Sequence, residues 1–91
     1  SATQFWSTQS ITSGSTQTYE LDTGGVRSVQ VIINTDLGSG ATDGFTLEVY
    51  MKTQSSGTKC NTALFSIALD DDPDGISFVL GPGTYSIELK N

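Results

Sequence analysis

Four aspartates stand close together in residues 70–75, whose sequence is DDDPDG, and they are the side chains best placed to do chemistry. The carboxylates of Asp70, Asp72 and Asp74 recur at every second position, and Gly75 allows a sharp turn after them. Carboxylate oxygens that converge in this way are ligands that Ca²⁺ prefers. Without a cation, neighbouring carboxylates repel one another. This spacing predicts a Ca²⁺ site at Asp70, Asp72 and Asp74.

The pattern D-x-D-x-D-G in residues 70–75 resembles the first half of an EF-hand calcium loop. A complete EF-hand loop ends in a bidentate Glu at its twelfth position, where this chain has Gly81, and residues 76–80 read as a strand rather than a helix. The resemblance therefore implies a calcium loop outside the EF-hand fold, with Asp36 or Asp43 as a further ligand. The alternative is a solvated turn whose charges keep a strand edge from pairing with another chain.

The remaining reactive side chains exclude most kinds of enzyme. The chain has no His, which excludes Ser-His-Asp and Cys-His sites, and its single Cys60 excludes an intramolecular disulfide and a cysteine-rich zinc site. A glycoside hydrolase needs two carboxylates across a cleft, one of them with a raised pKa. Glu20, Glu48 and Glu88 instead fall on the wet faces of predicted strands. We therefore expect a protein that is not an enzyme and that has no cofactor apart from Ca²⁺.

The charge and the apolar content bear on partners and location. The formal net charge is -6 with four Lys and Arg, too few to neutralise a run of phosphates, so we exclude nucleic acid as a partner. No apolar run is longer than three residues, against the roughly 20 that a membrane span needs. The first residues show no charged and apolar leader pattern, and the unpaired Cys60 favours assembly in a reducing cytosol.

Alternation of apolar and polar residues is the main structural signal, because side chains in a strand point to opposite faces in turn. We expect strands over residues 3–9, 16–21, 28–33, 45–52, 61–69, 76–80 and 84–90. Residues 61–69 also fit a helical stripe, and their strand neighbours decide in favour of a strand. Ile32 places an apolar residue on the otherwise polar face of residues 28–33, which predicts that this strand is covered on both faces.

Turn residues separate these strands, since Gly, Asp, Ser and Pro cluster at 22–25, 43–44, 55–57, 74–75 and 81–83. Short strands at a spacing of roughly ten residues are typical of a sandwich or a jelly roll. A chain of 91 residues has room for one domain. The predicted fold is all-β: a single antiparallel β-sandwich or jelly-roll-like domain of about seven short strands over residues 1–91.

Two groups of side chains are candidates for binding a partner. Alternation places Tyr50 on the exposed face of its strand, where its ring could stack on a sugar, anchor a protein contact, or be an ordinary exposed aromatic. Phe5 and Trp6 are adjacent, so they cannot face the same side of a strand, and one of them can still belong to the core. We expect residues 1–9 to form an edge strand or a docking arm, with Gln4, Phe5, Trp6 and Tyr50 as the partner-binding residues.

Small size, acidity and the lack of catalytic groups favour a structural or interaction subunit. In composition and architecture, including a final hairpin over residues 81–89, the chain resembles the small β decoration (cement) proteins that stabilise the capsids of tailed bacteriophages, and no diagnostic motif carries this resemblance. The resemblance implies a virion protein, assembled in the host cytoplasm. It would bind a larger protein assembly such as the lattice of a major capsid protein, as a single chain or as a homo-oligomer.

The alternative function is a carbohydrate-binding or adhesive module, secreted or at the cell surface. Ser, Thr and Asn on wet strand faces, together with Tyr50 and a calcium loop at residues 70–75, suit a Ca²⁺-assisted sugar site. A row of exposed, coplanar aromatics would distinguish this function from the first, and Tyr50 alone is a candidate member of such a row.

Overall fold

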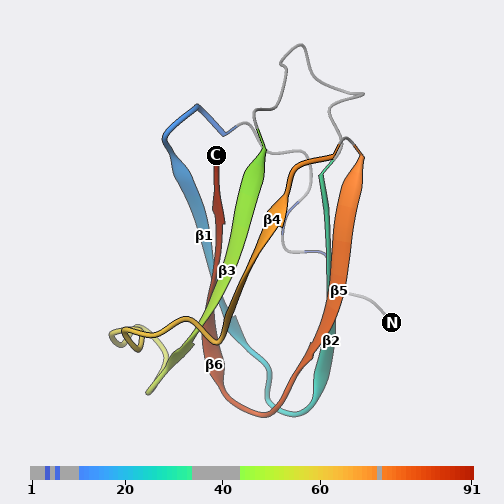
Figure 1. The fold of residues 1–91 in the computed structure, drawn as a ribbon. Coiled ribbons are helices and arrows are strands. Elements are labelled where there is room, and N and C mark those ends of the chain that lie inside the picture. The colour runs from blue at the N-terminus through green and yellow to red at the C-terminus, as the bar shows by residue number, and fades with distance from the viewer. Residues whose placement is uncertain (1–3, 5, 7–10, 34–43, 72) are drawn as a thin grey trace.

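The structure is a computed structural model that describes residues 4, 6, 11–33, 44–71 and 73–91. The described residues form six strands and contain no helix (Figure 1). The strands are β1 (Thr16–Asp22), β2 (Arg27–Ile33), β3 (Phe45–Lys52), β4 (Phe65–Leu69), β5 (Asp74–Leu80) and β6 (Thr84–Lys90). Among the residues that the structure describes, there is no helix that could cross a membrane.

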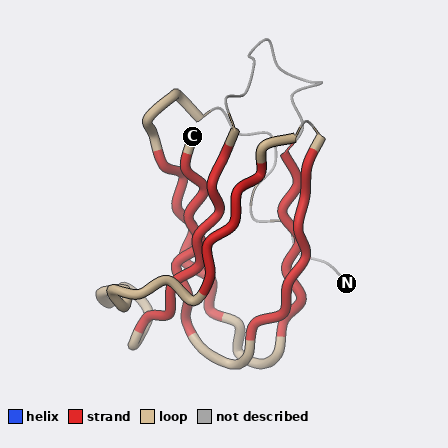
Figure 2. Tube along the Cα trace, in the orientation of Figure 1, coloured by secondary structure: helices blue, strands red, loops and turns tan. Residues whose placement is uncertain are grey.

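The strands form two sheets (Figure 2). Neighbouring strands within each sheet are antiparallel. The large sheet has four strands in the order β1-β6-β3-β4, and the small sheet pairs β2 with β5. Strands that follow each other in the chain, such as β1 and β2 or β5 and β6, therefore lie in different sheets. The final hairpin expected over residues 81–89 is wrong, because β6 pairs with β1 and β3 and not with β5. This arrangement confirms the predicted all-β fold and is compatible with a β-sandwich.

The core lies between the two sheets and follows from the alternation within each strand. Val29, Val31 and Ile33 are the buried residues of β2, and they belong to one cluster with the fully buried Leu47 of β3 and Ile87 of β6. Burying an aliphatic side chain of this size contributes about 1.5–3 kcal/mol. This shared apolar layer is therefore what holds the small sheet against the large one.

Aromatic pairs lie at the margins of the core. Phe65 of β4 meets Phe78 of β5 edge to face, with ring centroids 4.9 Å apart, and joins the two sheets on one side. Trp6 meets Tyr19 of β1 in the same manner, with centroids 6.5 Å apart. Edge-to-face contacts are favoured because the positive ring edge faces the negative ring surface.

Thr23 ties together the two connections between the sheets, residues 23–26 and 81–83 (Figure 1). Its backbone N–H donates to the carbonyl of Gly83 over 2.9 Å, and its hydroxyl accepts a hydrogen bond from the Gly83 N–H, also over 2.9 Å. The same hydroxyl donates to the carbonyl of Gly81 over 3.0 Å. Because Thr23 is buried, these bonds replace water at the point where one connection leaves the large sheet and the other enters it.

Most of the predicted strands are confirmed, with small shifts at their ends. The segment 61–69 contains a strand and no helix, and the strand begins only at Phe65. The described residues hold six strands rather than the seven expected, because the predicted strand at 3–9 lies outside them apart from Gln4 and Trp6, neither of which is in a strand.

Candidate functional site on the two outer faces

All three lysines and all three glutamates of the chain lie on or over the outer face of the large sheet. They form three ion pairs: Lys52 with Glu20, Lys59 with Glu88, and Lys90 with Glu48. The three positive and three negative charges on this face therefore sum to zero. The net charge of the protein comes from its seven aspartates and its single arginine.

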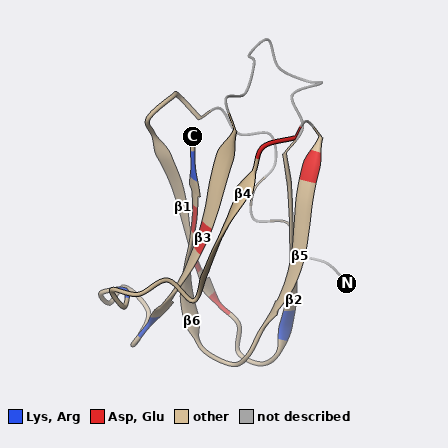
Figure 3. Cartoon of the chain, in the orientation of Figure 1, with Lys and Arg blue, Asp and Glu red and all other residues tan. Residues whose placement is uncertain are grey.

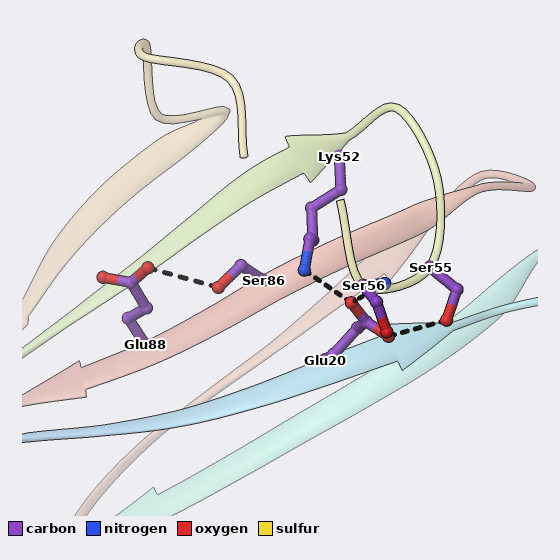
Figure 4. A network of polar contacts seen from close by, with 6 residues as sticks. All are labelled: Glu20, Lys52, Ser55, Ser56, Ser86 and Glu88. Atoms are coloured by element: carbon purple, nitrogen blue, oxygen red, sulfur yellow. Dashed lines mark hydrogen bonds and ion pairs between the residues drawn. The ribbon is translucent and has the colours of Figure 1, made fainter. Parts of the chain in front are cut away.

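The hairpin tip, residues 53–58 between β3 and β4, reaches across β6 and ends on β1 (Figure 4). Its contact point is Glu20, which accepts hydrogen bonds from the Ser55 hydroxyl over 2.9 Å and from the Ser56 backbone N–H over 2.8 Å. Lys52 donates to the same carboxylate. Ser56 has a φ of 61°, a left-handed conformation that a non-glycine residue rarely adopts.

The donors around Glu20 determine its ionisation. The hydrogen bonds from Lys52, from the Ser56 N–H and from the Ser55 hydroxyl lower the pKa of Glu20 to about 2, from its usual value of 4.5. A carboxylate in this state accepts hydrogen bonds and does not release a proton at neutral pH. Glu20 is therefore suited to anchoring the hairpin tip.

Glu48 and Glu88 stand directly opposite each other on β3 and β6. Like charges at opposed positions repel each other, so each carboxylate needs a cation of its own. Hydrogen bonds from Lys90 and from the Tyr50 hydroxyl lower the pKa of Glu48, and the same contacts raise the pKa of Lys90 and of Tyr50. Glu88 receives the ammonium of Lys59 at 2.6 Å and the hydroxyl of Ser86 at 3.2 Å.

Tyr50 lies on the outer face, as alternation predicts, but the exposure expected for it is wrong. The residue is 9% exposed, and the ammonium of Lys59 lies 4.0 Å from the centre of its ring. Its hydroxyl donates to Glu48 over 3.0 Å. The ring is therefore occupied within the chain itself, and its role in binding a partner stays a prediction.

The outer face of the small sheet carries exposed apolar residues where the large sheet carries ion pairs. Its apolar side chains are Ile32 of β2 and Val79 of β5, which are 61% and 66% exposed, and Val26, just before β2, is 71% exposed. The other outward positions hold small or uncharged residues: Ser28, Gln30, Gly75 and Ser77. The expectation that β2 is covered on both faces is wrong for the described chain, since nothing there covers Ile32.

Charges stand only at the ends of the small sheet. Arg27 begins β2, and Asp74 begins β5 at the opposite end of the antiparallel pair (Figure 3). The Arg27 guanidinium donates to the carbonyl of Thr23 over 3.0 Å. The stretch of sheet between Arg27 and Asp74 is therefore uncharged.

The predicted calcium residues are only partly described. Asp72 lies outside the described residues, Asp70 is exposed, and Asp74 accepts hydrogen bonds from the backbone N–H groups of Asp71 and Gly75 over 3.1 and 2.8 Å. Across the described ranges, no three His, Cys, Asp or Glu side chains are close enough to hold a metal ion. Calcium binding at Asp70, Asp72 and Asp74 stays a prediction.

The predicted N-terminal arm is also only partly described. Trp6 is half-buried and packs against the core, while Gln4 is exposed and Phe5 lies outside the described residues. The contact between Trp6 and Tyr19 gives the indole a place within this domain. Partner binding by Gln4, Phe5 and Trp6 stays a prediction.

Sequence reasoning missed the residues of the loop that cover the large sheet, above all Lys59, Ser55 and Ser56. A loop has no periodic pattern from which its path can be inferred. The only signal was the polar outward row on β3 and β6, which is rich in charges of both signs.

Comparisons of the chain with protein-family models, with curated protein sequences and with solved structures gave no significant match.

Proposed function

We propose that this protein is a non-enzymatic structural subunit that docks on a larger protein assembly, like the decoration proteins of tailed-bacteriophage capsids. The observation that carries the proposal is the outer face of the small sheet, where Ile32 and Val79 are exposed on an uncharged surface. Ile32 and Val79 stand near opposite ends of this face, with the uncharged Gln30 and Ser77 between them. Exposed apolar side chains that share one uncharged face suit a protein interaction site. The partner surface would be protein, because the face offers no charges for nucleic acid.

Docking through this face would be favourable because it removes apolar surface area from water. Fully burying one Val or Ile side chain contributes about 1.5–3 kcal/mol, and Val26, Ile32 and Val79 all stand largely free of contacts in the described chain. The uncharged positions around them carry no desolvation cost for ions. A flat assembly surface, such as a shell of capsid subunits, could cover all three side chains at once.

The proposal includes the finer architecture and the place of action. We regard the two packed sheets as a β-sandwich, and a jelly-roll-like arrangement of seven strands would need the strand predicted at residues 3–9. The protein would act in the virion after assembly in the host cytoplasm, as a single chain or as a homo-oligomer. The carbohydrate-binding alternative has less support, since the ring of Tyr50 is covered by Lys59.

Association with an assembly is tested by expressing a tagged full chain in the biological system from which its gene comes. Particles are then separated from free protein on a density gradient. We expect the chain to sediment with a particle of megadalton size at a fixed ratio to the main shell protein. Recovery of the unaltered chain in the free fraction alone would overturn the proposal.

A pair of variants assigns the docking to the small sheet. The double substitution Ile32→Glu and Val79→Glu should move the chain to the free fraction, because it places charges on the apolar face. The control substitutions Asn61→Glu and Thr62→Glu add the same charge at exposed positions of the β3–β4 loop and should leave the chain on the particle.

A further inference from the structure

The ammonium of Lys59 sits in a site made by three side chains of the large sheet. It lies 4.0 Å from the centre of the Tyr50 ring and 2.6 Å from Oε2 of Glu88. The hydroxyl of Ser86 donates to the same carboxylate oxygen over 3.2 Å, as Figure 4 shows for Ser86 and Glu88. An aromatic face beside a carboxylate is the arrangement that recognises organic ammonium groups.

The three side chains are buried, whereas their occupant is not. The side chain of Glu88 is 8% exposed, and Tyr50 and Ser86 are also buried. The side chain of Lys59 is 42% exposed and comes from the loop between β3 and β4. The ammonium can therefore leave the site without unfolding of the sheet beneath it.

The charge of the site calls for one cation. Glu88 faces Glu48, but Glu48 already holds the ammonium of Lys90. If Lys59 leaves, a single buried carboxylate is left without its direct counter-ion, and the cost of that state favours capture of another monovalent cation. The resident group contacts Oε2 of Glu88 as a single ammonium, so a primary ammonium is the ligand whose geometry the site already displays.

The loop that carries Lys59 is attached at separate points. The backbone N–H groups of Cys60 and Leu64 donate to the carbonyls of Met51 and Val49 over 2.7 and 2.6 Å. The hairpin tip is held separately by Glu20. Withdrawal of Lys59 therefore removes one attachment and leaves the others in place.

We propose that Glu88, Tyr50 and Ser86 form a binding site for a primary ammonium group, and that Lys59 is its resident ligand. The tethered lysine has a high effective concentration, so it excludes free amines from the intact protein. An ammonium from outside, such as a lysine side chain, enters only when Lys59 is withdrawn. The site is separate from the small sheet and does not depend on docking there.

The test is chemical rescue of the substitution Lys59→Ala by n-butylammonium chloride, measured as the melting temperature of the full chain. We expect the variant to melt about 4–8 °C below the unaltered protein. Butylammonium at about 100 mM should raise the melting temperature of the variant by about 2 °C relative to the same concentration of sodium chloride. The unaltered protein should show no such gain, because its site is filled.

The matched control is the double variant Lys59→Ala with Glu88→Gln, which lacks both the resident ligand and the carboxylate. It should not respond to butylammonium. The proposal is overturned if Lys59→Ala responds no more strongly than this double variant, whether both respond or neither does.

A measurement on the unaltered protein decides the question if Lys59→Ala does not fold. In a nitrogen-detected NMR spectrum of the lysine ammonium groups, the Lys59 signal should be shifted upfield by the Tyr50 ring, with the Lys52 ammonium, which sits on Glu20, as the internal reference. Absence of this shift in the folded protein would contradict the site.

Discussion

The two outer faces of this protein are built on strands of the same kind, but their side chains are satisfied in different ways. On the large sheet, every Glu forms an ion pair with a Lys. The loop between β3 and β4 crosses β6 and donates a hydrogen bond to Glu20. On the small sheet, Ile32 and Val79 are exposed, and nothing in the described part of the chain covers them. The charges of a polar face can be neutralised by ion pairs within the chain, whereas exposed apolar side chains leave water only when another surface covers them.

This contrast has a physical cause. Charged groups in or near water gain little from a second protein, since they are already solvated or paired. Exposed aliphatic groups lose their contact with water only when another surface covers them. The face that the chain completes for itself is therefore the less suitable one for assembly.

Both faces depend on Thr23, so the largest effect is expected there. Thr23→Val removes a buried hydroxyl that donates to Gly81 and accepts from Gly83, and should lower the free energy of unfolding by about 1–3 kcal/mol. Urea denaturation measures this loss. Thr23→Ser keeps the hydroxyl and should lose less; equal losses in the two variants would contradict the role given to the hydroxyl.

The ion pairs of the large sheet should contribute less. Lys59→Met leaves the buried carboxylate of Glu88 without its direct counter-ion, which should cost about 1–2 kcal/mol, below the value for a fully buried pair because Lys59 is partly exposed. A double-mutant cycle with Glu88→Gln isolates the interaction. Additive effects of the two substitutions would show that the pair contributes nothing to stability.

Acid should weaken the attachment of the hairpin tip. The pKa of Glu20 is lowered to about 2 in the folded protein, so its contribution to stability is fully present above the unfolded value of 4.5 and is lost as the pH falls from there toward 2. Melting temperatures of the unaltered protein and of Glu20→Gln should therefore converge across this range. A difference that does not change with pH would exclude the Glu20 carboxylate as the anchor.

The smallest effect on stability is expected on the small sheet. Ile32→Ser with Val79→Ser should change the free energy of unfolding by less than about 0.5 kcal/mol per site, because both side chains are already exposed in the folded chain. Differential scanning calorimetry of the isolated protein checks this. A large loss would mean that these side chains are covered within the chain, and the contrast between the two faces would then disappear.

The fold could be predicted from the sequence to a considerable degree. Alternation identified β3 and β6 with their correct ends, and it placed Glu48, Tyr50 and Glu88 on the outward side. It located β4 but began it too early, since residues 61–64 belong to the loop rather than to the strand. Alternation succeeds because it reflects the direction of each side chain relative to its neighbours in sequence.

The candidate sites were harder to predict, for reasons that particular residues illustrate. Tyr50 was expected to be exposed because its strand position is outward, but the position of a strand does not reveal that Lys59 from a later loop lies over the ring. Ile32 was expected to be covered because it is apolar. Alternation shows that a residue faces outward and does not show what lies outside it.

By itself, the sequence determined that this chain forms short strands with one apolar face each, because the direction of a side chain in a strand repeats every two residues. The strand order β1-β6-β3-β4 was decided only by the tertiary structure, since it depends on contacts between distant parts of the chain. That order sets Glu48 against Glu88 and brings residues 53–58 to Glu20. The same packing leaves the outer face of β2 and β5 open, because the described chain has no further element to place on it.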